Sequence, residues 1–232
     1  MEPSFISCAG YICAMRKFED SYRHKGMRKK LVDTVREKGI HDEKILDALN
    51  RIPRHYFLDS AFDEIAYEDK AFPIDADQTI SQPYTVAYQT QLLEVKPFMR
   101  VLEIGTGSAY QASVLAELGA QVFTIERQKK LFDLTKKFEY LRKYPNIKFF
   151  YGDGFEGLPT YGPFDRVIIT AAAPVIPPNL IDQMKVGGMM VIPVDNGDMQ
   201  TMKRIIKEEG GSYKTEVYDN FSFVPMLQGK NE

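Results

Sequence analysis

Two acidic residues and a pair of glycines at fixed spacing could bind a nucleoside-like ligand. Segment 100–112 reads R-V-L-E-I-G-T-G-S-A-Y-Q-A and contains Glu103, Gly105 and Gly107. Glycines directly after an apolar run allow a sharp turn, and they let a ligand approach the main chain closely. Glu126 follows this turn by about twenty residues, the spacing at which a carboxylate commonly accepts hydrogen bonds from ribose hydroxyls. These residues therefore predict a site for a ligand that carries a ribose.

The same segment argues against a dinucleotide. The dinucleotide fingerprint G-x-G-x-x-G/A needs a small third residue for close helix packing, and Tyr110 occupies that position. Glu103 adds a negative charge where a pyrophosphate would gain nothing from one. A cationic ligand suits the turn better, and E-x-G-x-G resembles the turn of methyltransferases that use S-adenosylmethionine. This interpretation makes Gly105, Thr106, Gly107 and Ser108 cofactor-binding residues.

The elements that must position these residues alternate between strands and helices. Val101, Leu102 and Ile104 form the apolar run of a strand buried on both faces. The pattern predicts further strands at 121–126, 147–150, 164–170, 189–194, 202–206 and 213–217. It predicts helices at 29–50 (two helices), 86–93, 110–118, 131–144 and 177–184, and an irregular loop at 59–77. Strands that alternate with helices indicate an α/β protein with a largely parallel sheet.

Five motifs in a fixed order resemble the protein-L-isoaspartate O-methyltransferase family. They are T-I-S-Q-P-Y at 79–84, V-L-E-I-G-T-G-S-A-Y-Q at 101–111, G-D-G at 152–154, F-D-R-V-I-I-T-A-A-A-P at 164–174 and F-V-P-M at 223–226. The resemblance covers roughly 27–230. It implies a Rossmann-like class I methyltransferase fold, with a mostly parallel seven-stranded sheet, helices on both faces and an N-terminal helical addition. It also implies S-adenosylmethionine as cofactor and S-adenosylhomocysteine as product.

The resemblance assigns roles to residues outside the glycine turn. It implies that the hydroxyls of Thr79 and Ser81 orient a substrate carboxylate, although Ser81 could equally cap the helix near Pro83. It places Asp153 beside the adenine and Gln200 on the cofactor, while a tight turn closed by Asp153 is the alternative. The substrate-binding residues that it implies are Ile80, Gln82, Pro83, Val224 and Pro225; the cofactor-binding residues are Glu103, Gly105, Thr106, Gly107, Ser108, Glu126, Asp153, Gly154 and Gln200.

The segment after strand 164–170 favours an oxygen acceptor. Amine methyltransferases of this fold carry an Asn/Asp-Pro-Pro-Tyr-like turn there, whereas this chain has T-A-A-A-P at 170–174. A carboxylate with a pKa near 4 is already ionised at neutral pH and needs no general base. The resemblance implies a more specific acceptor, the α-carboxylate of L-isoaspartyl residues, whose methylation starts repair through a succinimide. A same-fold enzyme acting on another carboxylate or on a hydroxyl is the first alternative, and a binding protein without turnover is the second.

Bulk properties set the remaining expectations. A chain of 232 residues is long enough for one domain, which we place at 27–232 after a flexible extension at 1–26. Within it, 27–98 is the helical and substrate-loop part, and 99–232 holds the cofactor-binding sheet and the C-terminal strands.

Charge and side-chain chemistry exclude several functions. The net charge of −2 argues against nucleic acid binding. Both cysteines, Cys8 and Cys13, precede the domain, and the three histidines are far apart in sequence, so we expect no metal site. No secretory signal and no bilayer-spanning run is recognisable. We expect a cytoplasmic monomer whose partners are isoaspartyl proteins and peptides.

Overall fold

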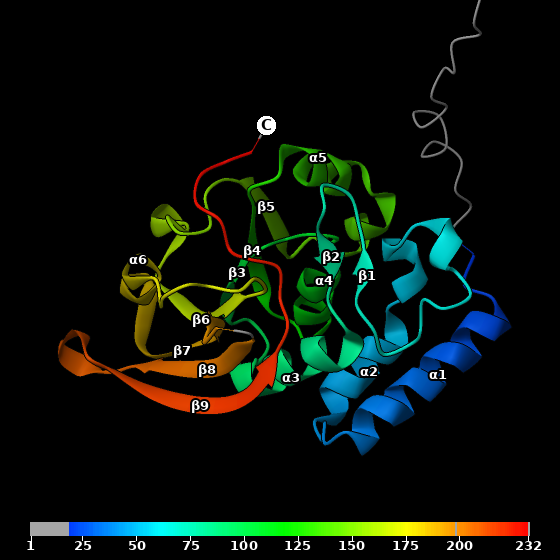
Figure 1. Ribbon diagram of the computed structural model, residues 1–232, viewed down its shortest axis with the longest axis horizontal. Helices are drawn as coiled ribbons and strands as arrows, with labels where there is room; N and C mark the ends of the chain where they lie inside the picture. The colour runs from blue at the N-terminus through cyan, green and yellow to red at the C-terminus, as the bar shows by residue number, and fades with distance from the viewer. Residues whose placement is uncertain (1–18, 198, 232) are drawn as a thin grey trace, which may run out of the picture.

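The computed structural model describes residues 19–197 and 199–231. Cys8, Cys13, most of the expected extension and Asp198 of the expected 196–198 turn lie outside these residues. Figure 1 shows a central sheet with helices packed against it and a helical part at its right side.

The central sheet has seven strands in the order β5-β4-β3-β6-β7-β8-β9. The strands are β3 (Arg100–Ile104), β4 (Gln121–Glu126), β5 (Ile147–Tyr151), β6 (Phe164–Ile169), β7 (Met184–Asp195), β8 (Gln200–Lys207) and β9 (Tyr213–Phe221). The first five in chain order pair in parallel, and β8 runs antiparallel to both β7 and β9. The expected mostly parallel seven-stranded sheet is confirmed.

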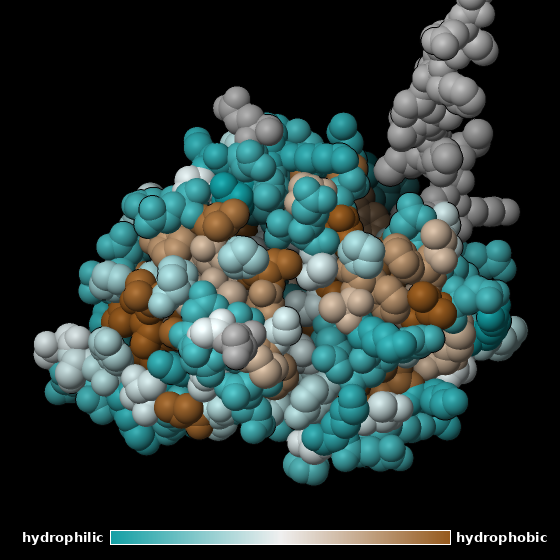
Figure 2. Space-filling model, viewed as in Figure 1, coloured by the Kyte–Doolittle hydropathy of each residue, from teal (hydrophilic) through white to brown (hydrophobic). Residues whose placement is uncertain are grey.

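Helices cover both faces of the sheet because successive side chains of a buried strand point to opposite sides. Val101, Val122 and Ile168 belong to a core shared with α2 (Glu43–Arg51), α3 (Pro83–Leu93) and α4 (Tyr110–Glu117). Leu102 and Phe123 belong to a second core with α6 (Pro178–Asp182). Figure 2 shows apolar side chains among hydrophilic ones on one face of the molecule, with a group of them near α6.

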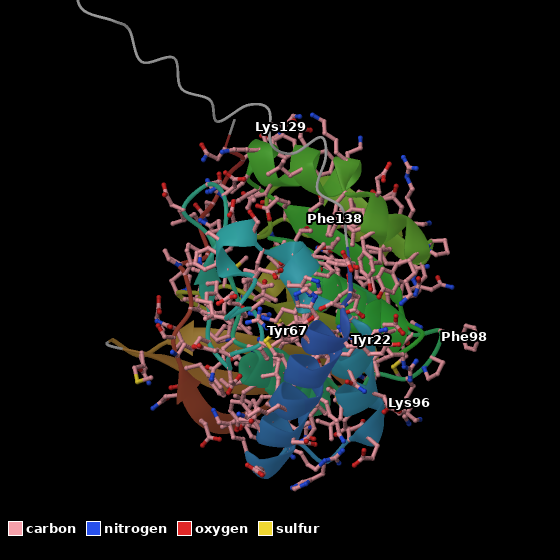
Figure 3. The ribbon with its side chains drawn as sticks, turned by 90° about the vertical axis from the view of Figure 1, so that its right-hand side faces the viewer. Tyr22, Tyr67, Lys96, Phe98, Lys129 and Phe138 are labelled. Atoms are coloured by element: carbon pink, nitrogen blue, oxygen red, sulfur yellow. The ribbon has the colours of Figure 1, made fainter. Side chains whose placement is uncertain are left out.

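The N-terminal helix α1 (Tyr22–Glu37) begins earlier than expected. Its N-cap is Ser21, whose hydroxyl accepts from the His24 backbone while the His24 ring bonds the Ser21 backbone. The expected domain boundary at residue 26 therefore falls inside this helix. The sequence signal was hidden because His24 supplies the return bond that Glu or Gln usually gives in a capping box. Figure 3 shows Tyr22 at the start of this helix.

The expected irregular loop at 59–77 contains regular structure. It includes the 3₁₀ turn η3 (Ser60–Phe62) and the short strand β1 (Phe72–Pro73), which pairs antiparallel with β2 (Thr79–Ile80). The short 3₁₀ helix η2 (Arg54–Phe57) precedes the loop. Thr79 therefore lies on a strand of a small hairpin, which fixes its backbone.

Two other expected boundaries are wrong. The helix expected at 131–144 is α5 (Lys129–Lys137), and it breaks at Phe138 before the 3₁₀ helix η4 (Glu139–Lys143). Gly187 and Gly188, which the sequence predicts to end the helix expected at 177–184, lie inside β7 instead, at an irregularity in its pairing with β6. Figure 3 shows Phe138 near the end of α5 and Phe98 pointing outward. The Phe98 side chain is 82% exposed.

The remaining 3₁₀ helices are η5 (Pro159–Tyr161) and η6 (Glu209–Gly211). Across residues 19–197 and 199–231, no helix has the length and apolar character needed to cross a bilayer.

Candidate active site

A cleft lies at the carboxyl ends of β3, β4 and β6, where ligands bind in open α/β sheets. It encloses about 580 Å³ of empty space, part of it open to solvent. Its lining consists of Gln78, Thr79, Ile104, Gly105, Gly107, Ile125, Glu126, Arg127, Gly154, Thr170, Ala171, Val224, Pro225, Met226 and Leu227. The predicted residues Thr79, Gly105, Gly107, Glu126, Gly154, Val224 and Pro225 are therefore brought together.

Gly105 is required by the turn that forms the floor of this cleft. Its φ of +95° lies in the left-handed region, and its N–H donates to the Ile125 carbonyl. A Cβ at this position would lie 2.6 Å from Thr170 Oγ1. The Thr170 hydroxyl donates to the carbonyls of Ile104 and Gly105, so it holds the turn against β6. The glycine thus leaves its backbone open to a ligand, as the motif predicts.

Glu126 at the end of β4 holds the second half of the turn. Its carboxylate accepts hydrogen bonds from the N–H groups of Gly107, at 2.8 Å, and Gln128, at 2.7 Å. Burial raises the pKa of this carboxyl, and the backbone hydrogen bonds oppose that rise. The side chain lines the cleft, so it can accept further bonds there, as the predicted ribose contact requires.

Glu103 lies beneath the glycine turn and is completely buried. Neither of its carboxyl oxygens has a hydrogen-bond partner of good geometry. Burial, with a smaller contribution from the charge of Glu126, raises the pKa of Glu103 to about 8, although the nearby Thr124 hydroxyl opposes the rise. A buried carboxyl without a partner fits a site that receives a cation, because a nearby positive charge favours the ionised form. The observation agrees with a sulfonium- and ammonium-bearing cofactor.

The raised pKa of Glu103 predicts a pH dependence of stability. The folded-state value of about 8 lies above the ordinary 4.5, so the folded chain binds the proton more tightly than the unfolded chain. Its contribution to stability is therefore complete below pH 4.5 and is lost as the pH rises through about 8. Urea unfolding without cofactor should show the wild type losing up to about 1.4 kcal/mol per pH unit relative to Glu103→Gln between pH 5 and 8. Parallel pH curves for the two proteins would contradict the buried, protonated carboxyl.

Two residues of the glycine turn that were predicted to bind the cofactor, Thr106 and Ser108, do not direct their side chains into the cleft. The Thr106 hydroxyl lies 2.6 Å from that of Thr124 in the interior, and the Ser108 hydroxyl accepts from the Tyr110 backbone. Neither residue lines the cleft. Their side chains support the turn, and a direct role in cofactor binding stays a prediction for them.

Asp153 closes a turn, as its alternative interpretation states. One carboxylate oxygen accepts from Phe155 N–H at 2.9 Å, and the other accepts from Gly229 N–H at 2.7 Å. Gly154 lines the cleft beside it. Carboxylate oxygens each have two lone-pair positions, so the turn and the predicted adenine contact are compatible.

The C-terminal segment 222–231 forms one wall of the cleft. Its F-V-P-M motif at 223–226 matches a terminal strand in the resembling family. Here the motif meets the sheet through a single bridge, in which the Ala172 N–H donates to the Val224 carbonyl and the Ala172 carbonyl accepts from the Met226 N–H. Further along, Arg127 donates to the carbonyls of Gln228 and Gly229. Figure 1 shows this segment, in red, running from β9 past the sheet to α5.

Gln200 lies at the start of β8 and does not line the cleft. Its amide donates to Asp195 and accepts from the Phe223 backbone at 2.8 Å. Gln200 therefore fixes the beginning of the C-terminal wall. The predicted contact with the cofactor stays untested.

Ser81 follows β2 and does not line the cleft, although Thr79 does. Ser81 does not cap α3, so the alternative interpretation of Ser81 is wrong. The N-cap of α3 is Gln82, and the Gln82 side chain makes no capping hydrogen bond. Asp69, from the preceding loop, accepts the Tyr84 N–H and the Gln82 amide instead.

The substrate-binding residues beside Ser81 do not all offer side chains. Ile80 and Pro83 are buried. The Gln82 side chain is bonded to Asp69. A direct contact of these three residues with the substrate stays a prediction.

Sequence reasoning missed several lining residues. They are Gln78, Ile104, Ile125, Arg127, Thr170, Ala171, Met226 and Leu227. Most of them adjoin a motif residue, so the ends of β3, β4 and β6 could have indicated them. Asp69 had no recognisable signal, because it reaches α3 from an acidic loop without a periodic pattern.

Three potential metal ligands meet away from the cleft, despite their separation in sequence. Ligand atoms of Asp20, His24 and His55 lie within 4.8 Å of one another. Each group already has partners: Asp20 is paired with Arg28, His24 with Asp63, and His55 with the Tyr67 hydroxyl. The two imidazoles stack with centroids 3.9 Å apart. The arrangement is that of a satisfied packing cluster.

The sheet order, the glycine turn after β3 and the acidic residue at the end of β4 define a class I methyltransferase fold. Two solved structures share it. One is titled protein-L-isoaspartate O-methyltransferase, with a TM-score of 0.78 and 26% identity over 85% of this chain and 65% of that one. The other is a putative protein-L-isoaspartate O-methyltransferase from Plasmodium falciparum in complex with S-adenosyl-L-homocysteine, with a TM-score of 0.76 and 24% identity over 86% of this chain and 98% of that one.

Sequence comparison narrows the class to a family. The family model described as protein-L-isoaspartate(D-aspartate) O-methyltransferase matches residues 26–231. Relatives named protein-L-isoaspartate O-methyltransferase include one from Christiangramia forsetii, 52% identical over 92% of this chain and 100% of that protein. Another, from Cytophaga hutchinsonii, is 54% identical over 90% of this chain and 94% of that protein. The chain belongs to the protein-L-isoaspartate(D-aspartate) O-methyltransferase family.

Proposed function

We propose that this protein transfers a methyl group from S-adenosylmethionine to the α-carboxylate of L-isoaspartyl residues in damaged proteins and peptides. The observation that carries the proposal is the meeting of Thr79, from the predicted substrate segment, with the glycine turn and Glu126 in one cleft. Membership of the family over nearly the whole chain supports the same reaction and substrate. The comparisons give no support to another acceptor.

The cofactor fits the residues that form the cleft. When bound, S-adenosylmethionine supplies a methyl group on a positively charged sulfur, and S-adenosylhomocysteine is the product. The Glu126 carboxylate would accept hydrogen bonds from the ribose hydroxyls, and the open backbone at Gly105 and Gly107 would lie against the ligand. The unpartnered carboxyl of Glu103 would stabilise positive charge from below the turn.

The substrate carboxylate is its own nucleophile because it is ionised near neutral pH. The site must therefore orient the carboxylate rather than deprotonate it. Such positioning can lower the activation barrier by roughly 7–11 kcal/mol. Thr79 faces the cleft, and Ser81 follows two residues later on the same segment. The negative charge of the carboxylate disappears when it attacks the methyl group. A lysine would stabilise that charge strongly and so slow the attack, whereas neutral hydroxyls can orient the carboxylate with a weaker hold. A backbone amide nitrogen of the substrate would then attack the ester carbonyl and release methanol, which closes a succinimide without further help from the enzyme. Hydrolysis of that ring restores some normal aspartate.

A pair of peptides tests the reaction. The peptides are identical except that one carries isoaspartate and the other aspartate, and each is incubated with methyl-labelled S-adenosylmethionine. We expect base-labile methyl ester on the isoaspartyl peptide alone. Label on neither peptide, with cofactor still bound in calorimetry, would contradict the substrate assignment and retain the cofactor assignment.

Replacement of Ser81 tests its proposed role. We expect Ser81→Ala to raise the barrier by about 1–3 kcal/mol, the scale of a hydrogen bond to a charged group. Turnover should fall while the cofactor Kd barely changes, and Ser60→Ala, on an exposed 3₁₀ turn of the same region, should behave as wild type. A large loss of cofactor binding in Ser81→Ala would remove Ser81 from the substrate side.

A monomeric state, a cytoplasmic location and the absence of a nucleic acid partner stay predictions. Size-exclusion chromatography with light scattering tests the first, and a second copy in solution would overturn it.

A further inference from the structure

Arg54 is a buried charge that the fold leaves incompletely satisfied. The side chain in η2 has no exposed surface, and its Nε and Nη1 atoms have no hydrogen-bond partner of good geometry among the described residues, although the nearby Tyr110 favours the charged form of Arg54. None of the ion pairs formed by the described residues includes Arg54. The negative charge of Asp69 favours the charged form of Arg54. The Asp69 carboxylate is itself bonded to Lys38, Gln82 and Tyr84.

The two other buried arginines differ from Arg54. Arg28 pairs with Asp20 through two hydrogen bonds and also donates to Tyr67 and to the Asn50 carbonyl. Arg166 uses all three of its nitrogens on backbone carbonyls. Burying a charge without a partner costs several kcal/mol, and apolar replacements of buried charges are often neutral or stabilising. Stability alone therefore gives no reason for an arginine at position 54.

The contacts that Arg54 does make connect the segment that follows β2 with the helix that follows the glycine turn. Its Nη2 atom donates to the carbonyl of Ser81, at 2.9 Å, and to that of Lys70, at 3.2 Å. Its guanidinium carbon lies 4.9 Å from the centre of the Tyr110 ring. Tyr110 begins α4, directly after the glycine turn, and it is buried. One planar group thus joins the segment that carries Thr79 and Ser81 to the element that carries the cofactor turn.

We propose that Arg54 is a positioning residue that fixes the distance between Ser81 and the glycine turn, and so sets the turnover rate. The inference rests on the proposed role of Ser81. In-line transfer depends steeply on the placement of the reacting groups, so a small shift of Ser81 slows turnover while the cofactor turn stays formed. Arg54 itself touches neither substrate nor cofactor, because it is completely buried.

Arg54→Met separates this role from a structural one. The variant removes the charge and keeps an apolar chain of similar length, so we expect a melting temperature close to that of the wild type or above it. Turnover at saturating peptide and cofactor should fall at least about tenfold, and the calorimetric Kd for S-adenosylhomocysteine should change less than about threefold. Arg166→Met is the matched control: it removes a buried arginine away from the cleft, so it should lower the melting temperature and leave kcat of the folded protein near wild type. A folded Arg54→Met with wild-type kcat would overturn the proposal.

A double-variant cycle distinguishes this inference from the proposed role of Ser81. If Arg54 acts by placing Ser81, Arg54→Met with Ser81→Ala should be hardly slower than Ser81→Ala alone. Multiplicative losses would overturn the Arg54 proposal while leaving the role of Ser81 intact. A fully active Ser81→Ala would instead overturn the role of Ser81, and with it this inference. If Arg54→Met does not fold, Arg54→Lys carries the same cycle, since it keeps the charge but not the planar contact with Tyr110.

Discussion

Glu126→Ala is expected to weaken cofactor binding more than any other single change in the cleft. The carboxylate holds the N–H groups of Gly107 and Gln128, and it lines the cleft where the ribose is predicted. Hydrogen bonds to a charged group contribute about 1.5–3 kcal/mol each, and the variant would lose both the turn contacts and the ligand contacts. The Kd for S-adenosylhomocysteine should rise by about 100-fold or more, which corresponds to about 2.7 kcal/mol.

A distant carboxylate provides the control for this variant. Glu216 on β9 bonds Arg204, Lys214 and Tyr218 away from the cleft, so Glu216→Ala makes the same substitution without touching the turn. Calorimetry should show an unchanged Kd for Glu216→Ala. A Kd for Glu126→Ala within about threefold of wild type would remove Glu126 from the ribose role.

Gly154→Ala is expected to damage both packing and binding. A Cβ at this position would lie 2.4 Å from Ile104 Cγ2 and 3.4 Å from Met226 Cε. Ile104 is buried, so it cannot swing away, and both neighbours line the cleft. Overpacking of this kind costs about 1–3 kcal/mol, and the melting temperature should fall by several degrees. The displaced wall should weaken cofactor binding about tenfold or more, which calorimetry measures.

Gly152→Ala is the matched control within the same G-D-G motif. Its Cβ would meet Ile125 Cγ2 at 3.6 Å, an ordinary contact, and its φ is not in the left-handed region. We expect a stability and a Kd close to wild type. Equal losses from Gly152→Ala and Gly154→Ala would show that the motif requires glycine for a reason other than the approach of Ile104.

The sequence predicted those parts of the site that depend on local signals. The run before Gly105 forms β3, and Glu126 ends β4 next to it, because parallel neighbours bring their carboxyl ends to one edge of the sheet. The order of motifs also indicated the family, and with it the cofactor and the acceptor. Thr79, Gly154, Val224 and Pro225 line the cleft together with this turn, as those motifs implied.

Local patterns were less informative at the ends of elements. The start of α1 depends on His24 returning a bond to Ser21, and α5 ends at Phe138 although its basic, amphipathic pattern continues. The helix ends were predicted from the spacing of apolar residues. That spacing does not show the capping hydrogen bond that starts α1 or the change of backbone direction that ends α5.

Sequence alone therefore determined the family and the sheet, and it predicted the residues that carry the chemistry. Only the tertiary structure decided what those residues touch. Asp69 caps α3, Arg54 joins Ser81 to Tyr110, and Gln200 fixes the C-terminal wall through Phe223, across long separations in the chain. Such contacts leave no periodic or local mark, because they depend on which loops the packed core brings together.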